Sequence, residues 1–504
     1  MQVMIKRIIK YIAVYIIAAA VMTGLLVGVA CIPQKSIKEN VKKSADFLCS
    51  NYIFLEKAEG IDASTIDRYA DSILVAIAYQ YDSKNPLKSV MWSSYYTEFT
   101  QDENLNLRDA VAEGKEANQQ YLRYWHGSNV VVRTLLLFLS LKGIYIFNAV
   151  MLCILLALLI FLLVKAKAYM LIAGLAAGLV ATSVWFVPFS LEYTWIFYIL
   201  LVMSIIMVVR ETRTIDSNRV GRKINDSSKN KDGGNNSNRN ELDRRQKTRN
   251  VGIAFMICGM VTCFMDFLTT ELLTLLVPLM IVMYFRWRSE ESISGVSQRG
   301  ISGSTKKSKK NDKKTIEKSK DVQAEDDVRN RVFGWKKAAV PVITWGIGYA
   351  GMWLTKWLMA SIVLGRNVMP YVKENLEERI NGEIGIGFWD YLQGALDRNV
   401  KTLMPWGLGA GGVFAALVIV FACLYMCYVY KKKTVRKNVI LIYAALAVIP
   451  FVRFLVLHNH SYLHFFFTFR VLGAVILALV LIMGEIVDFD ALRRKGRKKN
   501  KARR

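Results

Sequence analysis

The sequence predicts an all-α polytopic membrane protein with about ten transmembrane helices. Hydrophobic residues make up 53% of the 504 positions, and 67 Lys and Arg stand against 40 Asp and Glu. These classes are segregated, so that long apolar runs alternate with charge-dense stretches. A run near 20 residues matches the length of helix that crosses ~30 Å of hydrocarbon. Runs of this length exclude membrane strands.

The formal net charge of +27 does not indicate a nucleic-acid-binding protein. The excess of Lys and Arg lies beside the apolar runs, where basic residues mark the cytoplasmic side of a membrane. No nucleic-acid-binding motif accompanies the charge. No P-loop, GxSxG, HExxH or Rossmann glycine pattern occurs in a convincing context either. We therefore expect any catalytic centre on the outer side or in the outer leaflet.

The first part of the chain, residues 1–31, is predicted to hold a basic tail and a first span at 11–31. Residues 32–142 form a polar segment in which acids slightly outnumber bases, as expected outside. Within it, 66–81 is predicted to be an amphipathic helix, and 129–141 an interfacial helix that leads into the second span. Residues 143–209 contain three predicted spans, at 144–164, 169–186 and 194–209. The tip between the last two holds Pro188, Ser190 and Glu192.

Two basic stretches, 210–250 and 286–337, are rich in Asn, Ser, Lys and Arg and have almost no apolar pattern. We expect both to be disordered and cytoplasmic. The apolar stretch 251–285 between them must then cross the membrane an even number of times. It is long for one span and short for two, so it is predicted to form a tight hairpin with Asp266 and Glu271 near its outer tip.

The last part of the chain holds a seventh span at 338–364 and a second outer loop at 365–406, which contains an amphipathic stretch at 371–380. Residues 407–487 contain three more predicted spans, at 408–430, 439–457 and 465–486. A basic tail follows at 488–504. With this count every basic cluster and both termini fall on the cytoplasmic side.

Four acids on the outer side are candidates for general-base chemistry. A carboxylate near an apolar surface can have a raised pKa, which suits it to take a proton. Asp67 and Asp71 lie at the head of the amphipathic run, and Asp266 and Glu271 lie at the hairpin tip. A solvated surface acid is the alternative for each of them.

Three basic residues, Lys356, Arg453 and Arg470, lie near outer span ends, against the positive-inside trend. Ionisable groups in spans usually face a cavity or a partner, and such cations could bind a lipid-linked phosphate. The chain's only histidines share this face: His126, His458, His460 and His464. They are tolerated interfacial residues, metal ligands or partners of an anionic substrate, and their spacing matches no zinc signature.

Aromatic residues, Trp125 among them, crowd the same face. An interfacial belt explains them, and sugar stacking is the alternative. Two of the seven cysteines, Cys31 and Cys49, are both predicted outside, where a disulfide between them could form.

By its layout the chain resembles the GT-C class of membrane glycosyltransferases, which use polyprenyl-phosphate sugars. These enzymes share a first span, a large outer loop with a catalytic acid, and an interfacial helix that enters the second span. The run Arg123-Tyr124-Trp125-His126-Gly127 and the pair Phe147-Asn148 resemble that entry. The hairpin around Asp266-Phe267-Leu268-Thr269-Thr270 has a counterpart there too. Through this hairpin and the segment from His458 to Arg470, the chain also resembles uncharacterised polytopic proteins of Gram-positive bacteria.

This resemblance implies transfer of a sugar from a polyprenyl-phosphate lipid to a cell-envelope glycopolymer at the outer leaflet of the bacterial cytoplasmic membrane. Asp71 is implied as the general base, with Asp67 as second choice. Arg453, Arg470, Lys356 and the histidines would hold the lipid phosphate, and Asp266 would shape the site or bind a divalent cation. A transporter or flippase of a lipid-linked or anionic precursor is one alternative. A non-catalytic envelope assembly protein is the other.

Overall fold

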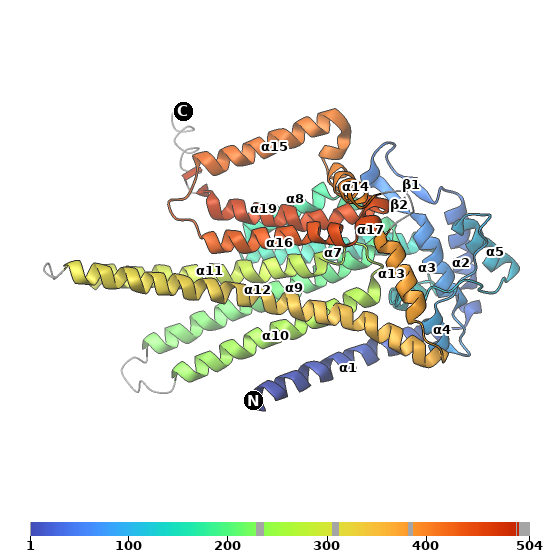
Figure 1. Cartoon of the computed structure of the whole chain (residues 1–504), viewed down its shortest axis with the longest axis horizontal. Coiled ribbons are helices and arrows are strands. Elements are labelled where there is room, and N and C mark those ends of the chain that lie inside the picture. The colour runs from blue at the N-terminus through green and yellow to red at the C-terminus, as the bar shows by residue number, and fades with distance from the viewer. Residues whose placement is uncertain (1, 228–235, 305–311, 382–386, 490, 493–504) are drawn as a thin grey trace.

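The computed structural model describes residues 2–227, 236–304, 312–381, 387–489 and 491–492. Long helices run side by side as a bundle, and one end of the bundle is covered by residues 32–140 (Figure 1). We call these residues the cap. The elements of the cap are α2 (Gln34–Cys49), β1 (Phe54–Glu56), η1 (Asp62–Ser64), β2 (Thr65–Asp67), α3 (Arg68–Gln80), α4 (Pro86–Trp92), α5 (Glu103–Glu113) and α6 (Asn129–Leu135).

The bundle is built mainly from apolar helices that follow the cap in sequence. Its elements are α1 (Gln2–Ala30), α7 (Leu141–Lys165), α8 (Tyr169–Ala181), η2 (Val184–Phe189), α9 (Leu191–Ser227), α10 (Asn236–Met265), α11 (Leu273–Ser304), α12 (Asp312–Leu364), α15 (Gly409–Val429), α16 (Lys437–Val456) and α19 (Leu472–Ile486). In the described part of the chain, seven stretches are long and apolar enough to cross a membrane, in α1, α7, α9, α12, α15, α16 and the run 465–486. This confirms an all-α polytopic membrane protein.

The count of ten spans stays a prediction, because the remaining apolar helices are shorter. Helix α8 has 13 residues, a length of about 20 Å at 1.5 Å per residue. The apolar part of α10, Val251–Met265, is similarly short. Between α10 and α11 the chain turns over residues 266–272, which is where the sequence predicts the hairpin tip.

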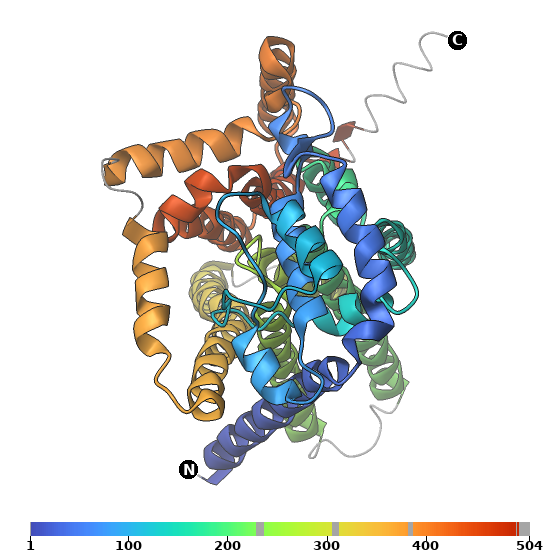
Figure 2. The same ribbon diagram turned by 90° about the vertical axis from the view of Figure 1, so that its right-hand side faces the viewer.

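Several loops contain more helix than the sequence predicts. Helices α9, α10, α11 and α12 continue into the basic stretches 210–250 and 286–337, and residues 228–235 and 305–311 lie outside the described residues. The interfacial stretch 129–141 is divided between α6 and the start of α7. The second loop forms α13 (Met369–Asn381), α14 (Phe388–Lys401) and η3 (Trp406–Leu408), and α13 and α14 border one side of the cap (Figure 2). Cys31 and Cys49 are free thiols.

The cap is held together by buried polar contacts as well as by its apolar core. The Ser72 hydroxyl of α3 donates to Asn104 Oδ1 of α5 at 2.6 Å, and Asn104 Nδ2 donates to the Leu48 carbonyl of α2 at 3.1 Å. These groups are buried. A buried polar group without a partner costs about 1–3 kcal/mol, so this network fixes how α2, α3 and α5 pack on one another.

We call the opposite end of the bundle the basic side. Arginine side chains link its helices by hydrogen bonds and an ion pair. Arg288 donates to the Ala166 and Lys167 carbonyls at the end of α7. Arg436 pairs with Glu485 at 2.5 Å, and this pair joins the start of α16 to the end of α19.

Helices α10 and α12 approach closely at two glycines. A Cβ at Gly259 would lie 2.1 Å from the Trp345 carbonyl oxygen, and a Cβ at Gly348 would lie 2.1 Å from the Met256 carbonyl oxygen. Both clashes are with backbone, which cannot rotate away. Small residues of this kind let membrane helices pack backbone to backbone.

We therefore expect Gly348→Ala to destabilise the protein by about 1–3 kcal/mol, the usual range for overpacking a close contact. Thermal unfolding in detergent measures this. Gly346→Ala on the same helix is the matched control, because nothing lies within 4 Å of a Cβ there. Equal stability of the two variants would contradict the close contact.

Candidate functional site

Two of the predicted acids lie on one face of α3, where the cap meets the bundle. Asp67 ends β2 and is the N-cap of α3, since its Oδ1 accepts a hydrogen bond from the Ala70 N–H at 2.8 Å. Asp71 follows one turn later, and a spacing of four residues places both on the same side of a helix. Both carboxyls are buried.

Asp71 joins the cap to the bundle. Its Oδ1 accepts from the Leu191 N–H at 2.8 Å and from the Ser190 hydroxyl at 3.3 Å, and its Oδ2 accepts from the Tyr145 hydroxyl. Leu191 is the first residue of α9, so the carboxylate lies at the positive end of that helix. Both oxygens are thus engaged by groups of the protein.

Glu192, in the first turn of α9, brings a third carboxyl to this place. It is hydrogen-bonded to Asp67, and its Oε2 is buried without a hydrogen-bond partner. Two carboxyls can bond in this way only if they share a proton, because two adjacent carboxylates repel. Asp67 and Glu192 therefore form a pair that can take up or release one proton. We call them the acid pair.

Burial is the main cause of the raised pKa values on α3. It raises the pKa of Asp67 to about 6, against the Ala70 N–H and Glu192, which lower it. It raises the pKa of Asp71 to about 7, where the Tyr145 hydroxyl acts against it and the charge of Asp67 acts with it. A carboxylate in this range is a stronger base at neutral pH than a solvated one.

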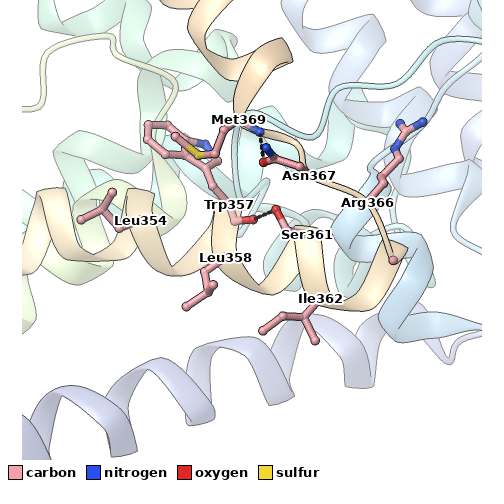
Figure 3. A pocket seen from close by; sticks show the side chains of 9 residues that line it. Leu354, Trp357, Leu358, Ser361, Ile362, Arg366, Asn367 and Met369 are labelled. Atoms are coloured by element: carbon pink, nitrogen blue, oxygen red, sulfur yellow. Dashed lines mark hydrogen bonds between the residues drawn. The ribbon is translucent and has the colours of Figure 1, made fainter.

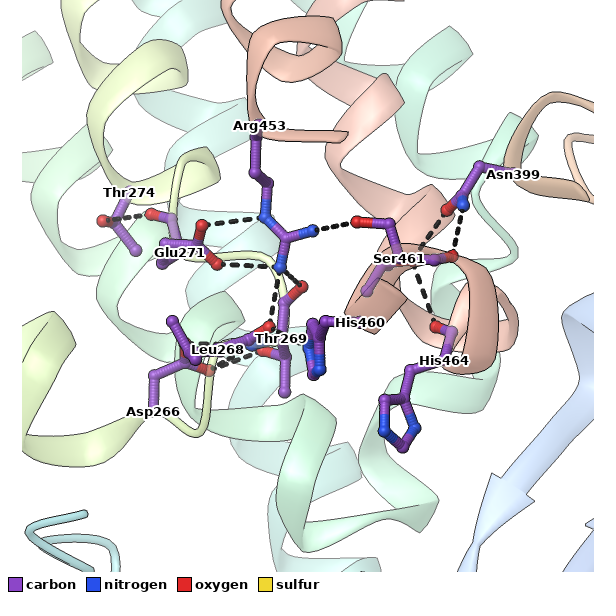
Figure 4. Close-up of polar contacts among 11 residues, drawn as sticks. Asp266, Leu268, Thr269, Glu271, Thr274, Asn399, Arg453, His460, Ser461 and His464 are labelled. Atoms are coloured by element: carbon purple, nitrogen blue, oxygen red, sulfur yellow. Dashed lines mark hydrogen bonds and ion pairs between the residues drawn. The ribbon is translucent and has the colours of Figure 1, made fainter. Parts of the chain in front are cut away.

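The hairpin tip carries the other two predicted acids, and both are engaged locally (Figure 4). Asp266 Oδ1 accepts from the Thr269 hydroxyl at 2.5 Å, which fixes the turn. Glu271 forms a buried ion pair with Arg453, with Oε1 and Nε 2.8 Å apart. Asp266 and Glu192 are close enough for their charges to interact.

All three nitrogens of the Arg453 guanidinium donate hydrogen bonds, and most of these go to this turn. Its Nη2 donates to the carbonyls of Leu268 at 2.7 Å and Thr269 at 3.0 Å, and its Nη1 donates to the Ser461 hydroxyl at 3.2 Å. The guanidinium therefore donates to backbone carbonyls of the turn that would otherwise lack the hydrogen bonds of a helix. This position leaves Arg453 no free edge for a phosphate.

Lys356 is likewise bound to the protein. Its ammonium donates to the Val90 and Met91 carbonyls at the end of α4, at 2.8 and 3.2 Å, and lies over the ring of Trp125. Trp125 Nε1 donates to the Met352 carbonyl at 2.8 Å. Both side chains thus fasten the cap to α12.

Arg470 is the predicted cation that lies beside the acids. It is buried, stacks on Tyr193 with 4.6 Å between guanidinium carbon and ring centre, and interacts with the charge of Glu192. Its Nη1 donates to the Phe466 carbonyl at 3.0 Å, whereas its Nε has no hydrogen-bond partner.

The four histidines do not form one group. His126 Nε2 lies 2.9 Å from the Tyr121 carbonyl, and burial lowers the pKa of His126 to about 3, so this ring is neutral at physiological pH. His458 packs between aromatic rings of α14. His460 contacts the Leu268 carbonyl at 2.9 Å, and its ring centre lies 4.7 Å from that of His464. Over the described residues, no three His, Cys, Asp or Glu side chains are placed to hold a metal ion.

An apolar pocket of about 710 Å³ lies at the cap end of α12 (Figure 3). Its wall includes Leu354, Leu358 and Ile362, which are exposed side chains of a candidate span. Ser361 and Arg366 lie at its end nearest the cap. An aromatic series, Trp357, Trp353, Tyr124 and Phe267, leads from this pocket to the hairpin tip.

The structure thus brings Asp67, Asp71, Asp266 and Arg470 together, with Glu271, Arg453, His460 and His464 around the adjoining turn. It places Lys356, Trp125 and His126 on the α12 side and His458 on the α14 side. The residue that sequence reasoning missed as a site residue is Glu192. Its signal was an acid in the first turn of an apolar helix, two residues after Ser190 and four after Pro188. No protein family, curated protein or solved structure matches this chain.

We expect Glu271→Gln to lower the free energy of unfolding by about 3–5 kcal/mol, because it leaves the buried Arg453 charge unpaired. Chemical unfolding in detergent measures this. The double variant Glu271→Gln/Arg453→Gln should lose less than the sum of the two single variants. Additive losses would show that the two groups are not coupled.

The raised pKa of Asp67 predicts a pH-dependent stability. The protonated acid is favoured in the folded protein, so its contribution is complete below the ordinary pKa of 3.8 and is lost as the pH rises through about 6. Over this pH range the free energy of unfolding falls by on the order of 3 kcal/mol. Thermal unfolding from pH 4 to 8 should therefore depend less on pH in Asp67→Asn than in the wild type. An unchanged slope in Asp67→Asn, with Glu113→Gln as the exposed control, would contradict this assignment.

Proposed function

We propose that this protein is a membrane glycosyltransferase of the bacterial cell envelope. It passes a sugar from a polyprenyl-phosphate donor to an envelope polymer at the outer leaflet. In this proposal the cap lies outside and the basic side lies in the cytoplasm, which follows the distribution of Lys and Arg between the two ends. The ten-span, GT-C-like arrangement and the cytoplasmic termini belong to the same proposal.

The observation that carries the proposal is the acid pair at the joint between cap and bundle. Asp67 takes the proton of an acceptor hydroxyl, and the freed oxygen forms a bond to the anomeric carbon of the donor. The bond from that carbon to the phosphate oxygen breaks, and its electron pair leaves on the phosphate. Glu192 holds the proton that the acid pair already shares, and its hydrogen bond keeps Asp67 free to accept the proton of the acceptor hydroxyl. Asp71, the base implied by the resemblance, supports this site by orienting α3, since its oxygens are already engaged.

Arg470 is the cation best placed to act on the donor phosphate, because it is next to Glu192 and has an unpartnered N–H. The apolar pocket on α12 is suited to a prenyl chain, since its wall is made of exposed span residues. The acids are buried, so substrate entry requires the β1–β2 hairpin to move. Two of its hydrogen bonds to the bundle are long: 3.3 Å from the Tyr193 hydroxyl to the Thr65 carbonyl and 3.4 Å from Arg470 to the Ala63 carbonyl.

A transporter of a lipid-linked or anionic precursor is the second candidate. The observation that favours it is the short hairpin turn at residues 266–272 with the buried pair Glu271–Arg453. Such a turn resembles the broken helices of transporters, where buried charges also occur.

The test is transfer of labelled sugar from a panel of undecaprenyl-phosphate monosaccharides to cell-wall polymer by the full chain in nanodiscs. We expect Asp67→Asn and Glu192→Gln to lower the rate by roughly 10²–10⁴-fold, the usual contribution of a general base. Glu113→Gln, an exposed cap acid, is the control.

Unchanged transfer in both acid variants would remove the proposed base. No transfer from any donor, together with movement of the lipid-linked sugar across a vesicle bilayer, would establish the transporter instead.

A further inference from the structure

A second pocket, with a more polar lining than the first, lies on the cap side of the molecule, between the cap and the start of α15. Its volume is about 290 Å³. We call it the rim pocket. Its lining comes from η1, from the end of α14 and from the η3–α15 junction: Ile61, Asp62, Ala63, Lys401, Thr402, Trp406, Gly407, Gly409 and Val413. Of these residues, only Ala63 contacts the site described above, through its carbonyl.

The walls of the rim pocket are fixed before any ligand binds. The Met404 N–H donates to the Ala181 carbonyl at the end of α8, and the Gly407 N–H donates to the Leu403 carbonyl, both at 2.8 Å. Gly412 of α15 approaches Pro405 so closely that a Cβ would lie 1.9 Å from its carbonyl oxygen. A preformed concave site with a few polar groups is the usual form of a small-molecule site.

The charges around the rim pocket do not suit an anion. Asp62 and Lys401 line it, and Lys401 pairs with Asp397 at 2.7 Å. Glu56 and Arg398 both act electrostatically on Asp62. Three carboxylates and two cations thus surround the opening, and they leave no positive excess for a phosphate.

The same lining does suit a neutral sugar. A carboxylate accepts hydrogen bonds from hydroxyl groups, and an ammonium or a threonine hydroxyl donates to them. Trp406 adds an aromatic face for the apolar side of a sugar ring. At about 290 Å³ the volume is at the lower end of the range for ligand pockets, about 300–1,000 Å³, and therefore suits a small group.

The rim pocket is also close to the acid pair. Ala63 forms part of its wall, and the Ala63 carbonyl accepts from Arg470. From Ala63 the chain continues into β2, which ends at Asp67. Because four residues of chain span at most about 13 Å, the Asp67 backbone lies within that distance of the pocket wall at Ala63.

We propose that the rim pocket is a carbohydrate subsite that holds a neutral sugar residue of the acceptor glycan. The role as acceptor subsite rests on the proposed function, whereas the binding of a neutral sugar can be measured without turnover.

The test is saturation-transfer NMR on the full chain in nanodiscs, with the methyl glycosides of glucose, galactose, mannose and N-acetylglucosamine as probes. We expect at least one glycoside to receive magnetisation. We expect Asp62→Ala and Trp406→Ala to weaken its binding roughly tenfold. Trp389→Ala is the control, because Trp389 is an exposed aromatic of α14 outside the pocket. Asp62→Asn, which keeps the size of the side chain, and a thermal unfolding curve of each variant show whether a loss of binding comes from misfolding.

The proposal is overturned if no neutral glycoside binds, if binding persists in both pocket variants, or if glucose 1-phosphate binds there and the neutral glycosides do not. If sugar is not transferred but a glycoside still binds and its binding depends on Trp406, the proposed function is wrong and the subsite stands. Transfer without glycoside binding would remove the subsite alone.

Discussion

The turn at residues 266–272 sets the constraint on which the rest of the structure depends. It joins the apolar helices α10 and α11. Lipid offers no hydrogen-bond partners, so the backbone groups of the turn need partners within the protein. Its carbonyls are therefore supplied with donors from distant parts of the chain. Arg453 donates to Leu268 and Thr269, and His460 contacts Leu268. The Gly127 N–H donates to the Phe264 carbonyl just before the turn, where a Cβ at Gly127 would clash with Phe264.

These contacts explain why the cap and the bundle form one unit. The turn holds the 123–127 segment of the cap on one side and α16 and α17 (His458–Leu463) on the other. Asp71 adds a second joint, since it bonds to the start of α9 and to Tyr145 of α7. Asp67, one turn before Asp71, is thereby brought to Glu192. The acid pair is thus a consequence of how the cap is anchored, and its burial is what raises the pKa of Asp67.

Much of this arrangement could be predicted from the sequence, and the missing parts have a physical reason. The hairpin tip followed from charge and length, because two basic stretches flank an apolar run that is short for two spans. The helix after Asp67 followed from its pattern. The partners of Lys356 and Arg453 could not be predicted, because they are mainly backbone carbonyls, which any residue carries. The separation of His458 from His460 and His464 depends on packing against α14 and the turn.

The central claim is that the cap and its acid pair face the outside of the cell. The most direct test is labelling of intact cells with a membrane-impermeant maleimide, in variants that lack the native cysteines. Phe99→Cys probes an exposed position of the cap, and Thr434→Cys probes an exposed position of the basic side. We predict that Phe99→Cys is labelled on intact cells and Thr434→Cys only after permeabilisation. The reverse pattern would place the acids in the cytoplasm and contradict the account.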